Sequence, residues 1–150
     1  MSQSLTQIYI HLVYSTKHRR TWLDPDLRPN VYAYKGRILR NRKCSPILIN
    51  GVEDHVHLLF RQSKGHTIEA LTRDLKSESS KWLKNSRDGF ADFAWQGGYA
   101  AFSVSPSKLD DARDYIARQE EHHRTMTFQE ELRILLDKHG IEYDERYLWD

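Results

Sequence analysis

The sequence contains little cysteine, little glycine and proline, and no long apolar run. Cys44 is the only cysteine, so an internal disulfide is excluded and a thiolate metal cluster is nearly so. Seven glycines and four prolines leave little material for disordered linkers. No stretch approaches the roughly 18 to 20 apolar residues that cross a bilayer, and residues 1–12 have neither a basic leader nor a small-residue cleavage site. We therefore expect a compact cytoplasmic protein, with one domain over residues 1–150 and no membrane partner.

The net charge of +2 conceals an uneven distribution along the chain. Residues 1–43 contain nine Lys or Arg and two Asp or Glu, whereas residues 130–150 contain three and seven. The basic N-terminal part could bind phosphate groups, whereas the acidic C-terminal part would be repelled by them. Ordinary solvated helix faces explain the same pattern equally well, so charge raises the question of nucleic-acid binding without answering it.

Hydrophobic spacing predicts four strands and four helices in the order βαββαβαα. The strands are expected over 5–16, 46–49, 56–60 and 93–104, with a turn or bulge at Asn50-Gly51 and a bend at Gly97-Gly98. The helices are expected from Asp24-Pro25 to 42, over 67–85, from Ser105-Pro106 through 119, and from the capping box Thr127-x-x-Glu130 to Gly140. A hairpin combined with helical crossovers predicts an α+β fold, a ferredoxin-like or RRM-like antiparallel sheet with helices on one face.

Two histidines in the third predicted strand are candidates for metal binding. Side chains alternate along a strand, so His55 and His57 share one face while Val56, Leu58 and Phe60 share the other. If the apolar trio packs under the helices, both imidazoles face outward and can converge on one divalent ion. Taken alone, however, such a pair is a weak motif and is more often two ordinary surface histidines.

A tyrosine and a glutamine on the helix after Pro106 form a second candidate pair. Tyr115 and Gln119 are four residues apart and lie one helical turn from each other on the same face. The amide of Gln119 could supply a neutral oxygen ligand. Packing at a helix edge explains such a pair as well.

Six segments, taken together and in their order along the chain, carry a more specific signal. They are Thr6–Lys17, Asn50–Leu59, Lys76–Trp82, Phe102–Ser105, Tyr115–His123 and Asp144–Asp150. Together they resemble the single-tyrosine transposases of the insertion-sequence-200/605 type and their REP-associated tyrosine transposase relatives, which are HUH endonucleases. Two local departures are Ala100 in place of the second glycine of a Gly-Tyr-Gly, and Arg118 in place of an expected Asn.

The resemblance implies a reaction, a metal and partners. His55, His57 and Gln119 would be the metal ligands and Tyr115 the nucleophile, on a helix near the sheet face opposite the covering helices. The family cleaves and rejoins single-stranded DNA beside hairpins through a 5′-phosphotyrosine, works with Mg²⁺ or Mn²⁺ and acts as a homodimer that can exchange this helix. No Gly-x-x-x-x-Gly-Lys loop is present, so we expect no nucleotide cofactor.

Basic and aromatic residues are candidates for binding the DNA. The phosphate contacts are expected from Lys17, Arg19, Arg20, Arg37, Arg40, Arg42, Lys43, Lys76, Lys81 and Lys84. Bases could stack on Tyr9, Tyr14, Trp95 or Tyr99, although some of these rings must belong to the core. The other imidazoles, His11, His66, His122 and His123, are expected at the surface or facing DNA.

Two rival functions stay open at this point. A domesticated, non-catalytic protein that binds single-stranded DNA or hairpins would keep the basic surface and would not need Tyr115. A zinc hydrolase would use His55 and His57 with a bound water, and Glu53 or Asp54 as its base. The presence of His55, His57, Tyr115 and Gln119 together favours the transposase.

Overall fold

A computed structural model describes residues 2–150 of the chain, and Met1 lies outside them. Its sheet contains β1 (Ile8–Ser15), β2 (Ser45–Gly51), β3 (His55–Gln62) and β4 (Ala100–Val104). All pairings are antiparallel and the strand order is β2-β3-β1-β4. The helices are α1 (Arg28–Asn41), α2 (Ile68–Ser86), α3 (Leu109–Ala117), α4 (Gln119–His122), α5 (Phe128–Lys138) and α6 (Glu145–Leu148), with short 3-10 turns at Lys17–Arg19 and Pro106–Lys108. This is the predicted ferredoxin-like α+β arrangement.

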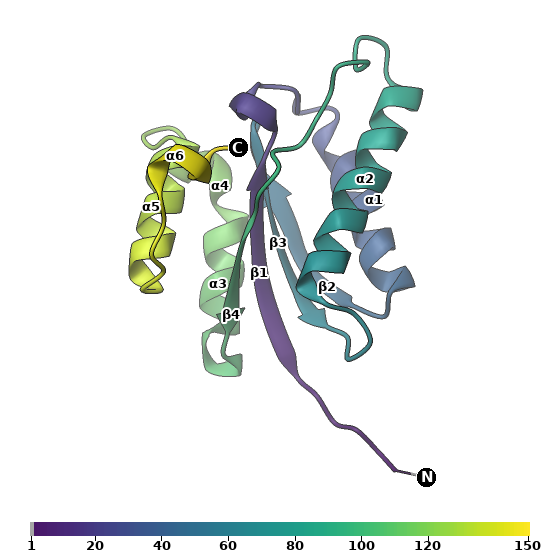
Figure 1. Ribbon diagram of the computed structural model, residues 1–150, viewed down its shortest axis with the longest axis vertical. Helices are drawn as coiled ribbons and strands as arrows, with labels where there is room; N and C mark the ends of the chain where they lie inside the picture. The colour runs from purple at the N-terminus through teal and green to yellow at the C-terminus, as the bar shows by residue number, and fades with distance from the viewer. Residues whose placement is uncertain (1) are drawn as a thin grey trace.

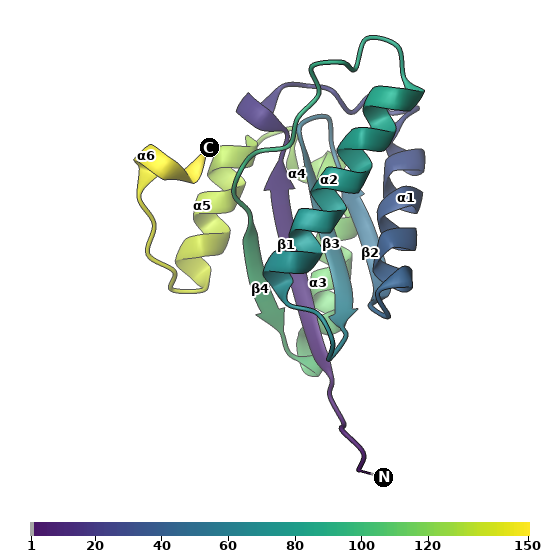
Figure 2. The same ribbon diagram turned by 45° about the vertical axis from the view of Figure 1, so that its right-hand side comes forward.

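Helices α1 and α2 cover one face of the sheet, and α3, α4 and α5 lie on the other (Figures 1 and 2). Val56, Leu58 and Phe60 of β3 enter the larger core, which α1 and α2 close with residues such as Leu39 and Leu75. The alternation of β3 therefore sends its histidines to the opposite face. The prediction that the helix with Tyr115 lies near that opposite face is confirmed.

A second, smaller core forms between α5 and the two strands β1 and β4. It brings Leu132 and Leu136 of α5 against Val13 and Phe102. The expectation of an outward-facing histidine pair is wrong for this reason, because helices cover the second face too. His55 and His57 are fully buried.

Two boundaries differ from the prediction for local backbone reasons. Helix α1 begins at Arg28, not at Pro25, because Asp24 starts a turn and Pro29 occupies the first helical turn, where its missing N–H costs nothing. Gly51 ends β2 and is no part of the turn, which consists of the next three residues. A Cβ on Gly51 would lie 2.2 Å from the carbonyl oxygen of His55, so this close approach of the two strands requires glycine.

The fourth strand and the helix after it are shorter than predicted. Strand β4 starts at Ala100, and Trp95 makes only an isolated bridge to Thr16 because its indole belongs to the larger core. Helix α3 ends at Ala117, and Arg118, with φ −101° and ψ 28°, separates it from α4. Tyr115 and Gln119 therefore lie on successive helices that meet at a break.

The predicted cap at Thr127 is present, and Thr67 caps α2 in the same way. The side chain of Thr67 accepts from the backbone N–H of Ala70, and that of Thr127 accepts from Glu130. Gly140, with φ +65°, follows α5 as a helix terminator should. Among the described residues, no helix is both long and apolar enough to span a bilayer.

Candidate active site

The site begins with two neighbouring histidines of β3, the strand between β1 and β2. Nε2 of His55 lies 3.1 Å from Oε1 of Gln119, which is also fully buried. The ring of His55 packs 5.1 Å from that of His57, measured between centroids. Helix α4 thus delivers Gln119 to the histidines as the resemblance implied, across the break at Arg118.

Tyr115 reaches the same place from α3. Its hydroxyl donates to Oε2 of Glu131 at 2.5 Å, and its ring stacks on His122 with the centroids 4.6 Å apart. Burial and the nearby carboxylate raise the pKa of the Tyr115 phenol well above its usual value. The phenol is therefore protonated and held in position by an acceptor. All four residues of the predicted constellation meet within one chain.

Glu131 of α5 is the site residue that sequence reasoning missed. Its side chain is buried, and its Oε1 accepts from Nε2 of His57 at 3.0 Å, from Nε2 of His123 at 3.0 Å and from Nε2 of His55 at 3.2 Å. Its Oε2 accepts from the amide of Gln119 at 3.0 Å as well as from Tyr115.

A signal for Glu131 was present in the sequence. The apolar stripe of the last helix contains Phe128, Leu132 and Leu135, and Glu131 sits within it at the same helical spacing. A carboxylate on the buried face of a helix requires partners, because an unpaired buried charge is costly. The helix was predicted, but which buried groups it would meet depends on tertiary packing.

The charges around Glu131 are strongly coupled. Burial alone would raise the pKa of this carboxyl, but the three imidazoles hold it well below its usual range. Burial would likewise lower the pKa of His55, but hydrogen bonds to Asp54 and Glu131 raise it to about 9. Burial lowers the pKa of His57, which lies between two other imidazoles. The site thus pairs a carboxylate with a protonated His55.

Both histidines are oriented by a partner on their other ring nitrogen. Nδ1 of His55 lies 2.7 Å from Oδ1 of Asp54, and Nδ1 of His57 lies 2.7 Å from Nε2 of His11. Since neutral His57 donates from Nε2, its Nδ1 accepts from His11. Such outer partners fix the tautomer of metal-binding histidines. The expectation that His11 and His123 lie at the surface is wrong, because helices on the second face cover both.

The donor atoms fit a divalent cation. His55, His57 and Glu131 each offer one ligand atom, and these atoms lie within 4.8 Å of one another. Imidazole nitrogen mixed with carboxylate and amide oxygen suits Mn²⁺ and other first-row ions, and oxygen ligands suit Mg²⁺.

The predicted phosphate contacts fall into two groups. Exposed or half-exposed side chains are Lys17, Arg19, Arg20, Arg37, Arg40, Lys43, Lys81 and Lys84. Two others are engaged within the protein. Arg42 pairs with Asp74 at 3.1 Å and with Glu78 at 2.6 Å, and Lys76 donates to the carbonyl oxygens of Gln96 and Gly98. Burial lowers the pKa of Lys76 to about 8.

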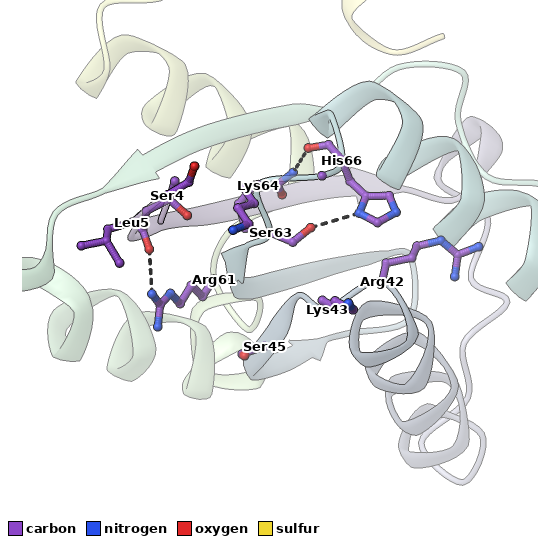
Figure 3. A pocket seen from close by; sticks show the side chains of 12 residues that line it. Ser4, Leu5, Arg42, Lys43, Ser45, Arg61, Ser63, Lys64 and His66 are labelled. Carbon is purple, nitrogen blue, oxygen red and sulfur yellow. Dashed lines mark hydrogen bonds between the residues drawn. The ribbon is translucent and has the colours of Figure 1, made fainter. Parts of the chain in front are cut away.

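A basic pocket of about 650 Å³ lies at the end of the sheet where β3 finishes (Figure 3). Arg42 and Lys43 come to it from the end of α1, Arg61 from β3, and Lys64 from the loop that follows. Arg61 donates to the carbonyl oxygen of Thr6 at 2.7 Å, which ties the N-terminal segment to the pocket rim.

The aromatic candidates for base stacking also divide. Tyr14 and Trp95 are buried core residues that pack edge to face with their centroids 5.1 Å apart. Tyr99 is 41% exposed and Tyr9 is half-buried, so these two rings are accessible.

Residues 4–119 match the family model described as "Transposase IS200 like". The chain belongs to the IS200-like transposase family. The protein is therefore a DNA-processing enzyme of the IS200-like transposase type. The match ends at Gln119, so Glu131 lies outside it.

Two solved structures share the fold of this IS200-like transposase. A candidate transposase from Deinococcus radiodurans R1 is 20% identical, with a TM-score of 0.62 over 79% of this chain and 98% of that one. A REP-associated tyrosine transposase bound to a REP hairpin is 15% identical, with a TM-score of 0.61 over 82% of this chain and 74% of that one. No curated protein matches the chain.

Proposed function

We propose that this IS200-like transposase cleaves and rejoins single-stranded DNA at hairpin-flanked ends, with Tyr115 as the nucleophile and residues 1–150 acting as one catalytic domain. The observation that carries the proposal is the convergence of Tyr115, Gln119, His55 and His57 around one buried carboxylate. A tyrosine that only packs at a helix edge would need one acceptor for its hydroxyl, but not two histidines and a glutamine around that acceptor.

The chemistry follows from the contacts of Tyr115. Its hydroxyl oxygen forms a bond to phosphorus while the bond from phosphorus to the 3′ oxygen breaks, which leaves a 5′-phosphotyrosine and a free 3′-hydroxyl. The phenol must lose its proton and the departing oxygen must gain one. The acceptor nearest to the phenolic proton is Oε2 of Glu131. Attack by another 3′-hydroxyl reverses the step, so rejoining requires no nucleotide cofactor.

His55, His57 and Gln119 would hold the metal, Mg²⁺ or Mn²⁺, next to Tyr115. A divalent ion there supplies positive charge to the phosphate oxygens as negative charge develops in the transition state. Asp54 and His11 keep the two imidazoles in their orientations. Asp54 contacts Nδ1 of His55. This contact favours a role for Asp54 in orienting His55 over a role as the base of a hydrolase.

The DNA would be held by surface cations away from the buried site. Exposed side chains such as Arg37, Arg40 and Lys43, together with the basic pocket beyond β3, offer positive charge to phosphates. A solved neighbour is a transposase bound to a hairpin, which supports a hairpin as the recognised element.

Two DNA ends call for two active sites, so we propose a homodimer. The site residues meet within one chain, where α3 packs on its own sheet. A dimer therefore needs no exchanged helix to complete each site. Light scattering of the purified protein measures this, and a monomer at micromolar concentration contradicts the dimer.

The test of the function is covalent capture of DNA. The protein is incubated with a pool of labelled single-stranded hairpins that have randomised flanks, with Mn²⁺ or Mg²⁺, and resolved on a denaturing gel. We expect a labelled adduct that EDTA abolishes and that the matching duplexes do not form. Hairpin binding without any adduct contradicts the proposal and favours the non-catalytic binder.

A further inference from the structure

We propose that Glu131 is a ligand of the divalent metal and that its carboxylate, delivered by α5, joins the metal to the nucleophile Tyr115. The inference rests on the metal-assisted function proposed above. It adds a ligand that His55, His57 and Gln119 do not include, from a helix beyond the part of the chain that matches the family.

The burial of Glu131 is the first argument. The side chain is 1% exposed and lies among the leucines of α5, yet a carboxylate in such surroundings is stable only beside positive charge. Three imidazole Nε2 atoms point at a single oxygen, Oε1, from two strand positions and one loop position. A divalent ion beside Oε1 would balance the charge of this carboxylate. The imidazole nitrogens would then bind the ion through their lone pairs and would no longer carry protons there.

The second argument is that the two carboxylate oxygens of Glu131 contact different groups. Oε1 faces His55, His57 and His123, whereas Oε2 accepts from Tyr115 and Gln119. Coordination through Oε1 leaves both Oε2 hydrogen bonds intact. One side chain then holds the metal and aims the phenol at the same time, which fixes the nucleophile relative to the ion.

The rigidity of the helix is the third argument. Thr127 caps α5, and the next residue, Phe128, packs its ring 4.7 Å from that of His55. Leu132 and Leu136 anchor the helix to the sheet. A metal ligand needs such support, because its position must be set to a fraction of an ångström.

The test measures metal binding without DNA. Mn²⁺ is titrated into the wild type, Glu131→Gln and the matched control Glu130→Gln by calorimetry, with free Mn²⁺ followed by electron paramagnetic resonance. Glu131→Gln keeps the volume and one oxygen but removes the charge. We expect its affinity to fall by at least about tenfold, the loss seen even for outer partners of metal ligands, and that of Glu130→Gln to stay unchanged.

Unchanged or tighter Mn²⁺ binding by folded Glu131→Gln overturns the inference. The carboxylate would then only fill the space that the cation enters and would not be one of its ligands. That result leaves the adduct chemistry of Tyr115 standing. No Mn²⁺ binding by the wild type overturns this inference and the metal part of the proposed function together.

A measurement on the wild type alone covers the case in which Glu131→Gln does not fold. Crystals soaked in Mn²⁺ locate the ion by its anomalous signal. An ion about 2 Å from a Glu131 oxygen supports the inference. An ion held by His55, His57 and Gln119 with Glu131 displaced from it overturns the inference.

Discussion

Nε2 of His11 and Nδ1 of His57 are 2.7 Å apart, so one imidazole on β1 orients another on β3 at the centre of the candidate site. The ring of His11 lies 5.9 Å from that of Phe102, between centroids, and is almost fully covered. When Nε2 of His57 binds a metal, the ring proton would lie on Nδ1 and be donated to Nε2 of His11, so this contact supports the metal-binding tautomer.

The variant His11→Phe tests this orienting role. It keeps an aromatic ring in the same place but removes the nitrogen that would accept from Nδ1 of a metal-bound His57, so we expect Mn²⁺ affinity to fall about tenfold to a hundredfold. Calorimetry measures the change. His66→Phe, at an exposed position beyond β3, is the control and should bind Mn²⁺ like the wild type. Equal affinity of all three proteins would show that the contact is incidental.

Replacing His57 by Ala separates catalysis from DNA binding. The buried ring contacts Glu131 and His11, and the exposed cations lie elsewhere. We expect His57→Ala to lose adduct formation and to keep its affinity for the hairpin within about threefold, whereas Arg40→Ala weakens hairpin binding, more so at low salt. Fluorescence anisotropy with labelled hairpins reports the affinities. A parallel loss of DNA affinity in His57→Ala would assign the histidine to DNA contact.

The cap of α5 should stabilise the protein measurably. Thr127 accepts the backbone N–H of Glu130, and its loss leaves that donor unpaired at the start of the helix that positions Glu131. We expect Thr127→Ala to lower the free energy of unfolding by about 1 kcal/mol in urea denaturation. Thr125→Ala, two residues before the cap, should change it much less. Equal stability of the two variants would show that the cap contributes nothing.

Lys35 gives a prediction about pH. Its Nζ is fully buried, donates to the Tyr14 hydroxyl at 2.6 Å and to Ser79 at 3.2 Å, and burial together with the charge of Lys76 holds its pKa well below 10.5. The unfolded chain therefore binds more protons than the folded protein as pH rises toward 10.5, so stability rises with pH over that range. Urea denaturation between about pH 7 and pH 9, where nearly all tyrosine stays protonated, should show this rise.

The matched variant for this effect is Lys35→Met, which keeps the volume and removes the amine. We expect its stability to rise less steeply with pH than that of the wild type. Lys76, whose pKa is lowered to about 8, is present in both proteins, so the difference between the curves reports Lys35. Parallel curves would contradict the lowered pKa of Lys35.

The sequence predicted the elements well where local signals decide them. The strand β1, the cap Thr127 and the terminator Gly140 all depend on neighbours in the chain, and all are present. The start of α1 was wrong, because two prolines compete for the first turn and only the packing of Leu27 and Val31 selects the second.

The candidate site was predicted in part. His55, His57, Tyr115 and Gln119 lie together as the resemblance implied, because their elements belong to the matched fold. Glu131 could not be found this way. Its partners come from β3, α3 and α4, and no spacing within the sequence indicates that α5 folds back over the histidines.

The most direct test of the central claim is to identify the tyrosine that becomes linked to DNA. The adduct is digested with protease and nuclease, and the modified peptide is sequenced by mass spectrometry, with Tyr115→Phe and the control Tyr147→Phe treated in parallel. Tyr147 is exposed and makes no site contact, so its variant should form adduct like the wild type. We expect a nucleotide on Tyr115 and no adduct in Tyr115→Phe. An adduct that persists in folded Tyr115→Phe, or a nucleotide on any other tyrosine, would contradict this expectation.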